Sequence, residues 1–163
     1  SLTLLVPRIE DGLFTTAAHP SFFWHVETST PISARFILSD PKTADPIYTQ
    51  SLNIQNSGIS QIDLPAEVAL EPGTRYRWTV LVACNGSGSQ EVAARSFIER
   101  VSEPNLVRPP LSSSIEQAAS YAARGIWYDA LSSLIRASQQ DPTNDAVNQE
   151  LRSLLLQMNQ PQI

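Results

Sequence analysis

The stretch Leu70-Glu71-Pro72-Gly73-Thr74-Arg75-Tyr76 decides the fold class of this chain. Its Pro72-Gly73 pair marks a turn, because proline fixes φ and glycine accepts backbone conformations that other residues avoid. Directly after the turn, Tyr76, Trp78 and Val80 stand at alternate positions. Alternation with a period of two is typical of a β-strand that buries one face. The stretch therefore predicts a turn that leads into a core strand.

The same pattern of short apolar runs between turn residues continues in both directions along the first 102 residues. Such spacing is typical of a β-sandwich of about 100 residues. We therefore predict a seven-stranded antiparallel β-sandwich over residues 1–102. Its expected strands are Leu2 to Val6, Phe22 to Glu27, Ser33 to Ser39, Ile47 to Ile54, Ile59 to Leu64, Arg75 to Cys84 and Glu91 to Val101.

Alternation also assigns the two faces of each expected strand. The side chains expected in the core include Phe22, Trp24, Val26, Ala34, Phe36, Leu38, Tyr76, Trp78, Val80, Val82 and an inert Cys84. The outward set comprises Arg35, Ile37, Arg75, Arg77, Leu81, Arg95 and Phe97. We expect the apolar members Ile37, Leu81 and Phe97 to be covered by the C-terminal part of the chain, since exposed apolar area is unfavourable. The alternative is that these three side chains receive a partner.

The remainder of the chain is predicted to be helical after a short linker. Residues 103–111 contain three prolines and no alternation, which indicates a semi-rigid linker. Periodicity of about 3.6 then predicts a three-helix tail over residues 112–163. The expected helices run from Ser112–Ser114 to Gly125, from Trp127 to about Gln139, and from about Thr143 to Met158. The fold class is therefore α+β, with strands and helices segregated along the chain.

Composition excludes several classes of partner. The chain has 11 lysines and arginines against 16 acidic residues and a net charge of −5, whereas nucleic-acid binding needs a clustered basic surface. No apolar run approaches the roughly 18 residues that a membrane span needs, so we expect no membrane insertion. A single cysteine allows no intrachain disulfide.

Residues for catalysis or metal binding are sparse. His19 and His25 are the only histidines, and neither stands in a pattern with a nucleophile and an orienting carboxylate. We interpret His19 as a turn residue that hydrogen-bonds local backbone, and His25 with Glu27 as an exposed strand pair. One cysteine and two histidines offer no zinc-type spacing. We therefore expect no catalytic residue, no metal and no cofactor, and thus a protein that is not an enzyme.

Two parts of the chain resemble known folds. The stretch through Tyr76, together with Trp24, resembles the tyrosine corner and buried tryptophan of fibronectin type III domains. The run Ala122-Ala123-Arg124-Gly125-Ile126-Trp127-Tyr128-Asp129-Ala130-Leu131, with Asp141-Pro142 beyond it, resembles one tetratricopeptide repeat. About three stacked repeats are usually needed for stability, so we expect this tail to dock on another part of the molecule.

The whole chain is similar to a cyanobacterial family, domain-of-unknown-function family 928. The matching segments are Leu4-Leu5-Val6-Pro7, His19-Pro20, Tyr76-Arg77-Trp78 with Cys84, Glu99-Arg100-Val101 and, above all, Gly125-Ile126-Trp127-Tyr128-Asp129-Ala130-Leu131. This resemblance implies an extracytoplasmic protein, periplasmic or secreted, with no assigned activity.

The leading functional hypothesis is a non-catalytic interaction module with a protein partner. A concave surface of helices can receive an extended peptide or a helix. The candidate contact residues are Tyr121, Arg124, Tyr128 and Arg136, which are equally compatible with an ordinary helical rim. The alternatives are carbohydrate or cell-envelope binding by the sandwich through Phe23, Tyr48 and Phe97, and an enzyme with an unfamiliar site at His19 or His25.

Overall fold

The computed structural model describes residues 1–7, 13–83, 91–102 and 113–157. Eight strands precede three helices in these residues. The strands are β1 (Leu2–Leu4), β2 (Phe14–Thr15), β3 (Ser21–Val26), β4 (Ile32–Ser39), β5 (Pro46–Ile54), β6 (Gly58–Asp63), β7 (Arg75–Ala83) and β8 (Glu91–Arg100). The helices are α1 (Ser114–Ala123), α2 (Trp127–Gln140) and α3 (Asp145–Leu156). The α+β class and the segregation of strands from helices are confirmed.

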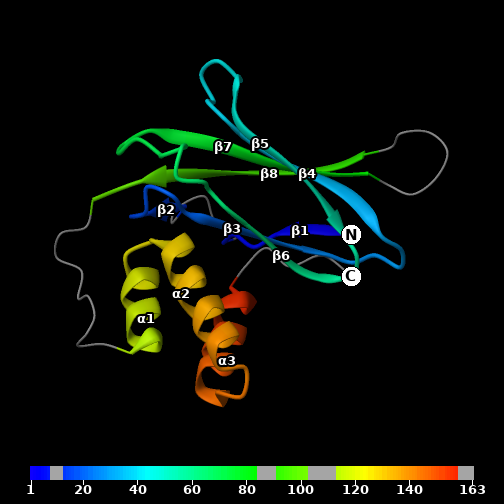
Figure 1. Ribbon diagram of the computed structural model, residues 1–163. Helices are drawn as coiled ribbons and strands as arrows, with labels where there is room; N and C mark the ends of the chain where they lie inside the picture. Colours follow the sequence, from blue (N-terminus) through cyan, green and yellow to red (C-terminus); the bar gives the residue numbers. More distant parts are fainter. Residues whose placement is uncertain (8–12, 84–90, 103–112, 158–163) are drawn as a thin grey trace.

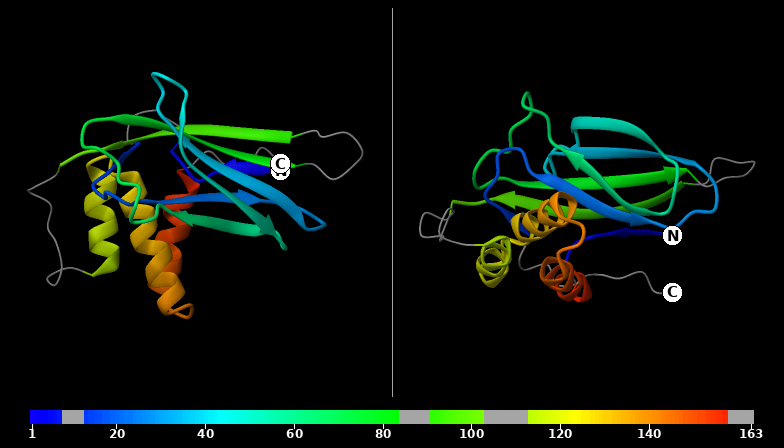
Figure 2. Two further views of the ribbon diagram at one scale, coloured as in Figure 1. Left: turned by 45° about the horizontal axis from the view of Figure 1, so that its top comes forward. Right: turned by 60° about the horizontal axis from the view of Figure 1, so that its bottom comes forward.

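The strands form two sheets that face one another (Figure 1). The smaller sheet has the order β1-β3-β6, and the larger has the order β2-β8-β7-β4-β5. The three helices lie together against the outer side of the smaller sheet, toward one end of the two-sheet body (Figures 1 and 2). The two ends of the sandwich are therefore different, because helices approach only one of them.

The expectation of seven purely antiparallel strands is wrong in one element. The segment Phe14–Thr15 forms an additional strand, β2, that pairs in parallel with β8. Two residues are too short to show alternation, so the sequence carries no strand pattern there. The seven expected strands are all present, each with bounds within about two residues of those predicted.

The faces assigned by alternation are confirmed in the core. Phe22, Trp24, Phe36 and Trp78 are each 0% exposed. The ring centroid of Phe22 lies 4.9 Å from that of Phe36 and 5.0 Å from that of Trp78, within the range of favourable aromatic contacts. The inward position expected for Cys84 lies outside the described residues.

The turn before β7 forms as its sequence indicates. The backbone N–H of Glu71 donates to the hydroxyl of Tyr76 at 3.0 Å, which fixes the loop to the start of the strand. Gly73 has a φ of +78°, a conformation that side chains with a Cβ rarely adopt. Its N–H donates to the carbonyl of Arg100 at the end of β8, at 2.8 Å. The turn thus joins three parts of the chain at one end of the sandwich.

The helices begin at residues whose side chains cap them. The hydroxyl of Ser113 accepts from the N–H of Glu116 at the start of α1, and the side chain of Asn144 caps α3 in the same way. Gly125, with a φ of +75°, allows the reversal between α1 and α2. The expected linker at 103–111 lies outside the described residues. No helix within the described ranges is long and apolar enough to cross a membrane.

The surface that the tail covers differs from the expected one. The helices pack on Leu5 and on Phe23, whose side chain points outward from β3. Phe23 is therefore only 2% exposed. The prediction that the tail covers Ile37, Leu81 and Phe97 is wrong, because these side chains project from the outer face of the other sheet. Phe97 is covered instead by Arg75, whose guanidinium carbon lies 4.6 Å from the centre of its ring.

Candidate functional site

The outer face of the larger sheet carries the whole outward set expected from the sequence. Strand register places Arg77 opposite Phe97, Thr79 opposite Arg95, and Arg35 opposite Leu81. We call this surface the arginine face and define it by seven residues. They are Arg35, Ile37, Arg75, Arg77, Leu81, Arg95 and Phe97.

The arginine face concentrates positive charge in an acidic chain. Four of the chain's 11 basic residues lie on it, against two acidic residues on the same side of the sheet, Glu91 and Glu99, whereas the net charge of the whole chain is −5. Arg35, Arg75 and Arg95 are exposed, and Arg77 is half-buried. Within the described part of the chain, Arg35, Arg77 and Arg95 form no ion pair. Guanidinium groups of this kind can bind carboxylates or phosphates of another molecule.

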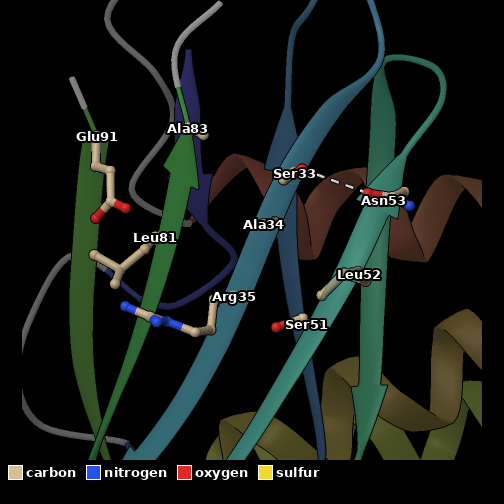
Figure 3. A pocket seen from close by; sticks show the side chains of 9 residues that line it. All are labelled: Ser33, Ala34, Arg35, Ser51, Leu52, Asn53, Leu81, Ala83 and Glu91. Atoms are coloured by element: carbon tan, nitrogen blue, oxygen red, sulfur yellow. Dashed lines mark hydrogen bonds between the residues drawn. The ribbon is translucent and has the colours of Figure 1, made fainter. Parts of the chain in front are cut away.

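A hollow of about 360 Å³ lies at one end of this face (Figure 3). Four strands contribute to its lining, which includes Ser33, Arg35, Ser51, Asn53, Leu81 and Glu91. Figure 3 shows the side chain of Arg35 extending from β4 toward β7, beside Leu81. The hollow exists because small side chains, such as those of Ser33, Ser51 and Ala83, replace long ones at adjacent positions of the sheet.

The lining of the hollow carries several groups that can hydrogen-bond a ligand. The hydroxyl of Ser33 donates to the side-chain oxygen of Asn53 at 3.4 Å, a long contact that a ligand can replace. No histidine lines the hollow, so its serines have no imidazole base beside them. Among the described residues, no group of three or more His, Cys, Asp or Glu side chains is placed to hold a metal ion. The chemistry available here is a cation beside several neutral hydrogen-bonding groups and one carboxylate.

The histidines lie elsewhere. Nδ1 of His19 is 2.8 Å from the backbone carbonyl oxygen of Val68, so the ring contacts backbone as expected, but its partner is 49 residues away and not local. His25 stands on the outward side of β3, opposite Ile59 on β6. The two rings therefore contribute nothing to the hollow.

The four candidate contact residues of the tail do not form one surface. Arg124 and Arg136 are exposed, and Tyr121 is partly buried against the other helices. Tyr128 is 2% exposed and belongs to the core of the sandwich, which contradicts its expected place on an accessible rim. The predicted helical contact surface therefore loses its central aromatic residue.

Tyr128 closes the end of the sandwich between the two sheets. Its ring centroid lies 6.0 Å from that of Phe22 and 6.4 Å from that of Trp78. The indole N–H of Trp78 donates to the Tyr128 hydroxyl at 2.8 Å, and this hydroxyl donates to the carbonyl of Phe97 at 2.6 Å. Burial raises the pKa of the Tyr128 hydroxyl well above its ordinary value, so the group is neutral at physiological pH.

Trp127 and Asp129, the two residues that flank Tyr128, form hydrogen bonds with other segments at the same end of the sandwich. Trp127 donates its indole N–H to the carbonyl of Leu5 at 3.3 Å. Asp129 accepts from the Thr15 hydroxyl at 2.5 Å and from the backbone N–H of Thr16 at 2.9 Å, and it also accepts from the Thr16 hydroxyl. The first turn of α2 is thus a three-residue clamp, defined as Trp127, Tyr128 and Asp129, that fastens the tail to the sandwich.

Helical spacing alone does not single out the buried place of Tyr128 in the sandwich. Tyr128, Leu131 and Ile135 are spaced by three and four residues, so they form a second apolar stripe beside the one through Trp127 and Leu134. All five side chains are buried. Only Tyr128 of this stripe lies in the core of the sandwich, whereas Leu131 and Ile135 pack in the same cluster as Trp127 and Leu134.

The aromatic side chains considered for carbohydrate binding are not displayed for it. Phe23 is buried under the helices, and the ring of Phe97 is occupied by Arg75. Tyr48 is half-buried, packs against the core and donates its hydroxyl to the side chain of Gln50 at 2.5 Å. Sugar binding by stacking needs an exposed flat ring, which none of the three provides.

Comparison with known proteins gives a family but no function. No curated protein matches the chain. The model of a family described as Domain of Unknown Function (DUF928) matches residues 1–163, so it covers both the sandwich and the helices. The chain therefore belongs to this family of unknown function.

Proposed function

We propose that this protein is a non-catalytic interaction module whose arginine face binds an acidic protein partner. The observation that carries the proposal is a set of arginines on one sheet, three of which have no ion-pair partner among the described residues, in a chain with net charge −5. Interspersed Ile37, Leu81 and Phe97 add half-buried apolar area between these charges. Arginine beside apolar side chains is typical of protein interfaces, where complementary charge gives specificity and fast association.

The arginine face supports the proposal better than the helices do. The clamp uses Tyr128 and Asp129 for contacts within the chain. Tyr128, the aromatic residue that the sequence suggested for an accessible surface of the tail, is buried. The sheet face also carries the hollow of about 360 Å³, in which an acidic side chain of a partner can reach Arg35.

Charge reversal on the sheet tests this proposal. We expect Arg35→Glu/Arg95→Glu to weaken capture of acidic proteins from a native extract by about tenfold or more, because repulsion replaces attraction at the interface. The matched control is Arg136→Glu/Arg152→Glu, which reverses two exposed arginines of the tail and changes the net charge equally. Captured proteins are quantified by mass spectrometry at two salt concentrations, after circular dichroism has shown that both variants are folded.

The outcome distinguishes the two surfaces. Loss of partners only in the sheet variant, with weaker capture at high salt, supports the arginine face. Loss of captured partners only in the tail variant would indicate that the helices form the contact surface. Equal capture by wild type and both variants would contradict an electrostatic interaction module altogether.

We also propose that the two parts are a fibronectin type III-like sandwich and a tetratricopeptide-like tail. The hydrogen bond from Glu71 to the Tyr76 hydroxyl supports the first, since it has the geometry of a tyrosine corner. The helix pair α1 and α2, joined through Gly125, supports the second. Family membership supports the further proposal of an extracytoplasmic protein from a cyanobacterium. Cell fractionation that recovers the native protein in the cytoplasm would contradict this location.

A further inference from the structure

Among the strands that the structure describes, β5 is an open edge of the larger sheet. The opposite edge strand, β2, contacts α2, whereas β5 has β4 as its paired neighbour. Natural proteins usually protect long edge strands with charges, prolines or bulges, because an open edge pairs readily with another strand. In β5 the proline is the first residue, Pro46, and the bulge lies at the same end, opposite Leu38 and Ser39. No charged residue follows between Ile47 and Ile54.

The side chains of β5 also leave apolar area in contact with water. Ile47 projects outward and is 42% exposed. Tyr48 and Leu52 point inward and pack against the core, but both remain half-buried rather than buried. An additional strand beside β5 would cover all three side chains, since cross-strand neighbours lie about 5 Å apart.

We propose that β5 pairs antiparallel with β5 of a second copy of this chain, with Gln50 on the two-fold axis. This register places Tyr48 opposite Leu52 and Thr49 opposite Ser51 of the second copy. Inward side chains then continue both cores and outward side chains continue both arginine faces, because antiparallel partners share a face. The second copy is the occupant that the pattern fits, since Tyr48 meets Leu52, the uncharged Asn53 meets Ile47, and no charge opposes a charge.

The edge of the smaller sheet provides the comparison. Strand β6 is also an edge, and its Ile59 is 47% exposed. It is shorter than β5, with 6 residues against 9, and it ends in the charged residue Asp63. The larger sheet therefore offers the longer uncharged edge, and we assign the pairing to β5.

The proposal does not depend on the proposed function. Self-association is measured with the pure protein. A protein that does not self-associate would therefore say nothing for or against partner binding by the arginine face. If both hold, the dimer presents two arginine faces side by side as one wide basic surface, which would raise affinity for an elongated acidic partner.

Sedimentation equilibrium over a range of protein concentrations tests the pairing. A single pair of edge strands buries less than a standard interface, so we expect a weak dimer with a dissociation constant of about 10 to 100 μM. Thr49→Glu/Ser51→Glu places two like-charge pairs across the axis and is expected to raise that constant at least about tenfold. The control Ile59→Glu, on β6, is expected to leave it unchanged.

A charge-swapped mixture fixes the register and guards against misfolding. Thr49→Lys/Ser51→Lys alone should also be monomeric, whereas a one-to-one mixture of the glutamate and lysine variants should form a heterodimer as tight as the wild type or tighter. Three results would overturn the proposal: a wild type that stays monomeric up to about 1 mM, a dimer lost in Ile59→Glu but kept in the glutamate variant, and failure of the mixture to associate.

Discussion

Replacing Tyr128 with alanine is expected to lower the free energy of unfolding by about 4 kcal/mol, the range found when a large aromatic side chain is removed from a core. The loss has two sources. The ring fills the end of the sandwich beside Phe22 and Trp78, so alanine leaves a cavity there. The hydroxyl also satisfies the indole N–H of Trp78 and the carbonyl of Phe97, and both groups would lose this partner.

Equilibrium unfolding in urea measures this effect and separates its sources. Tyr128→Phe keeps the ring and removes the hydrogen bonds, so we expect a smaller loss of about 1 to 3 kcal/mol. Tyr121→Ala is the matched control, because this tyrosine packs against the other helices and is only partly buried. A Tyr128→Ala variant no less stable than Tyr121→Ala would show that the end of the sandwich does not depend on this ring.

The same hydroxyl should make stability depend on alkaline pH. Its folded-state pKa is raised, so the contribution of the neutral form is fully present below the unfolded-state pKa of about 10. Above that pH the unfolded chain releases the proton and the folded protein retains it, and stability falls by about 1.4 kcal/mol per pH unit. This part of the pH dependence should disappear in Tyr128→Phe.

Truncation after Ser102 is expected to abolish cooperative folding of the remaining chain. The helices cover Phe23 and Leu5 and close the core at Trp78. Removing the helices exposes Phe23 and Leu5 to water and also removes the contacts of Tyr128. The combined loss in the free energy of unfolding is comparable to the whole stability of a small domain, about 5 to 10 kcal/mol. Near-ultraviolet circular dichroism and analytical gel filtration should show lost tertiary structure and aggregation.

Truncation after Asn144 is the informative control. It removes α3 but keeps the clamp, so we expect a folded protein of reduced stability. A sandwich that stays soluble and unfolds cooperatively after truncation at Ser102 would contradict the structural role of the tail. It would also favour two independent domains.

Most of the sandwich could be predicted because its signals are local. Proline and glycine at the turn before β7, and alternation around Trp24 and Trp78, depend on neighbouring residues alone. The alternation also predicted that Arg35, Arg77 and Arg95 point to the same side of the sheet, and the observed strand register places them on one face. The hollow was missed, because it results from small side chains on four strands that become neighbours only when the sheet forms.

The position of the tail depends on contacts that sequence patterns do not report. Thr15 and Asp129 are 114 residues apart, and neither stands in a motif that indicates the other. The segment around Trp127, which carried the family resemblance, was interpreted as part of a repeat with an accessible surface. Its tyrosine is instead buried among Phe22 and Trp78, and this pairing of aromatic residues from two distant segments can be seen only in the assembled fold.

The clamp has a consequence for synthesis of the protein on the ribosome. Translation delivers both sheets before Tyr128 is made, at about 5 to 20 residues per second. Since the chain up to Ser102 is not expected to fold by itself, Phe22 and Trp78 stay unburied in the nascent chain for the several seconds before α2 follows. Chaperones that bind exposed aromatic segments would therefore meet this chain during that interval, and their release would follow once α2 has left the exit tunnel.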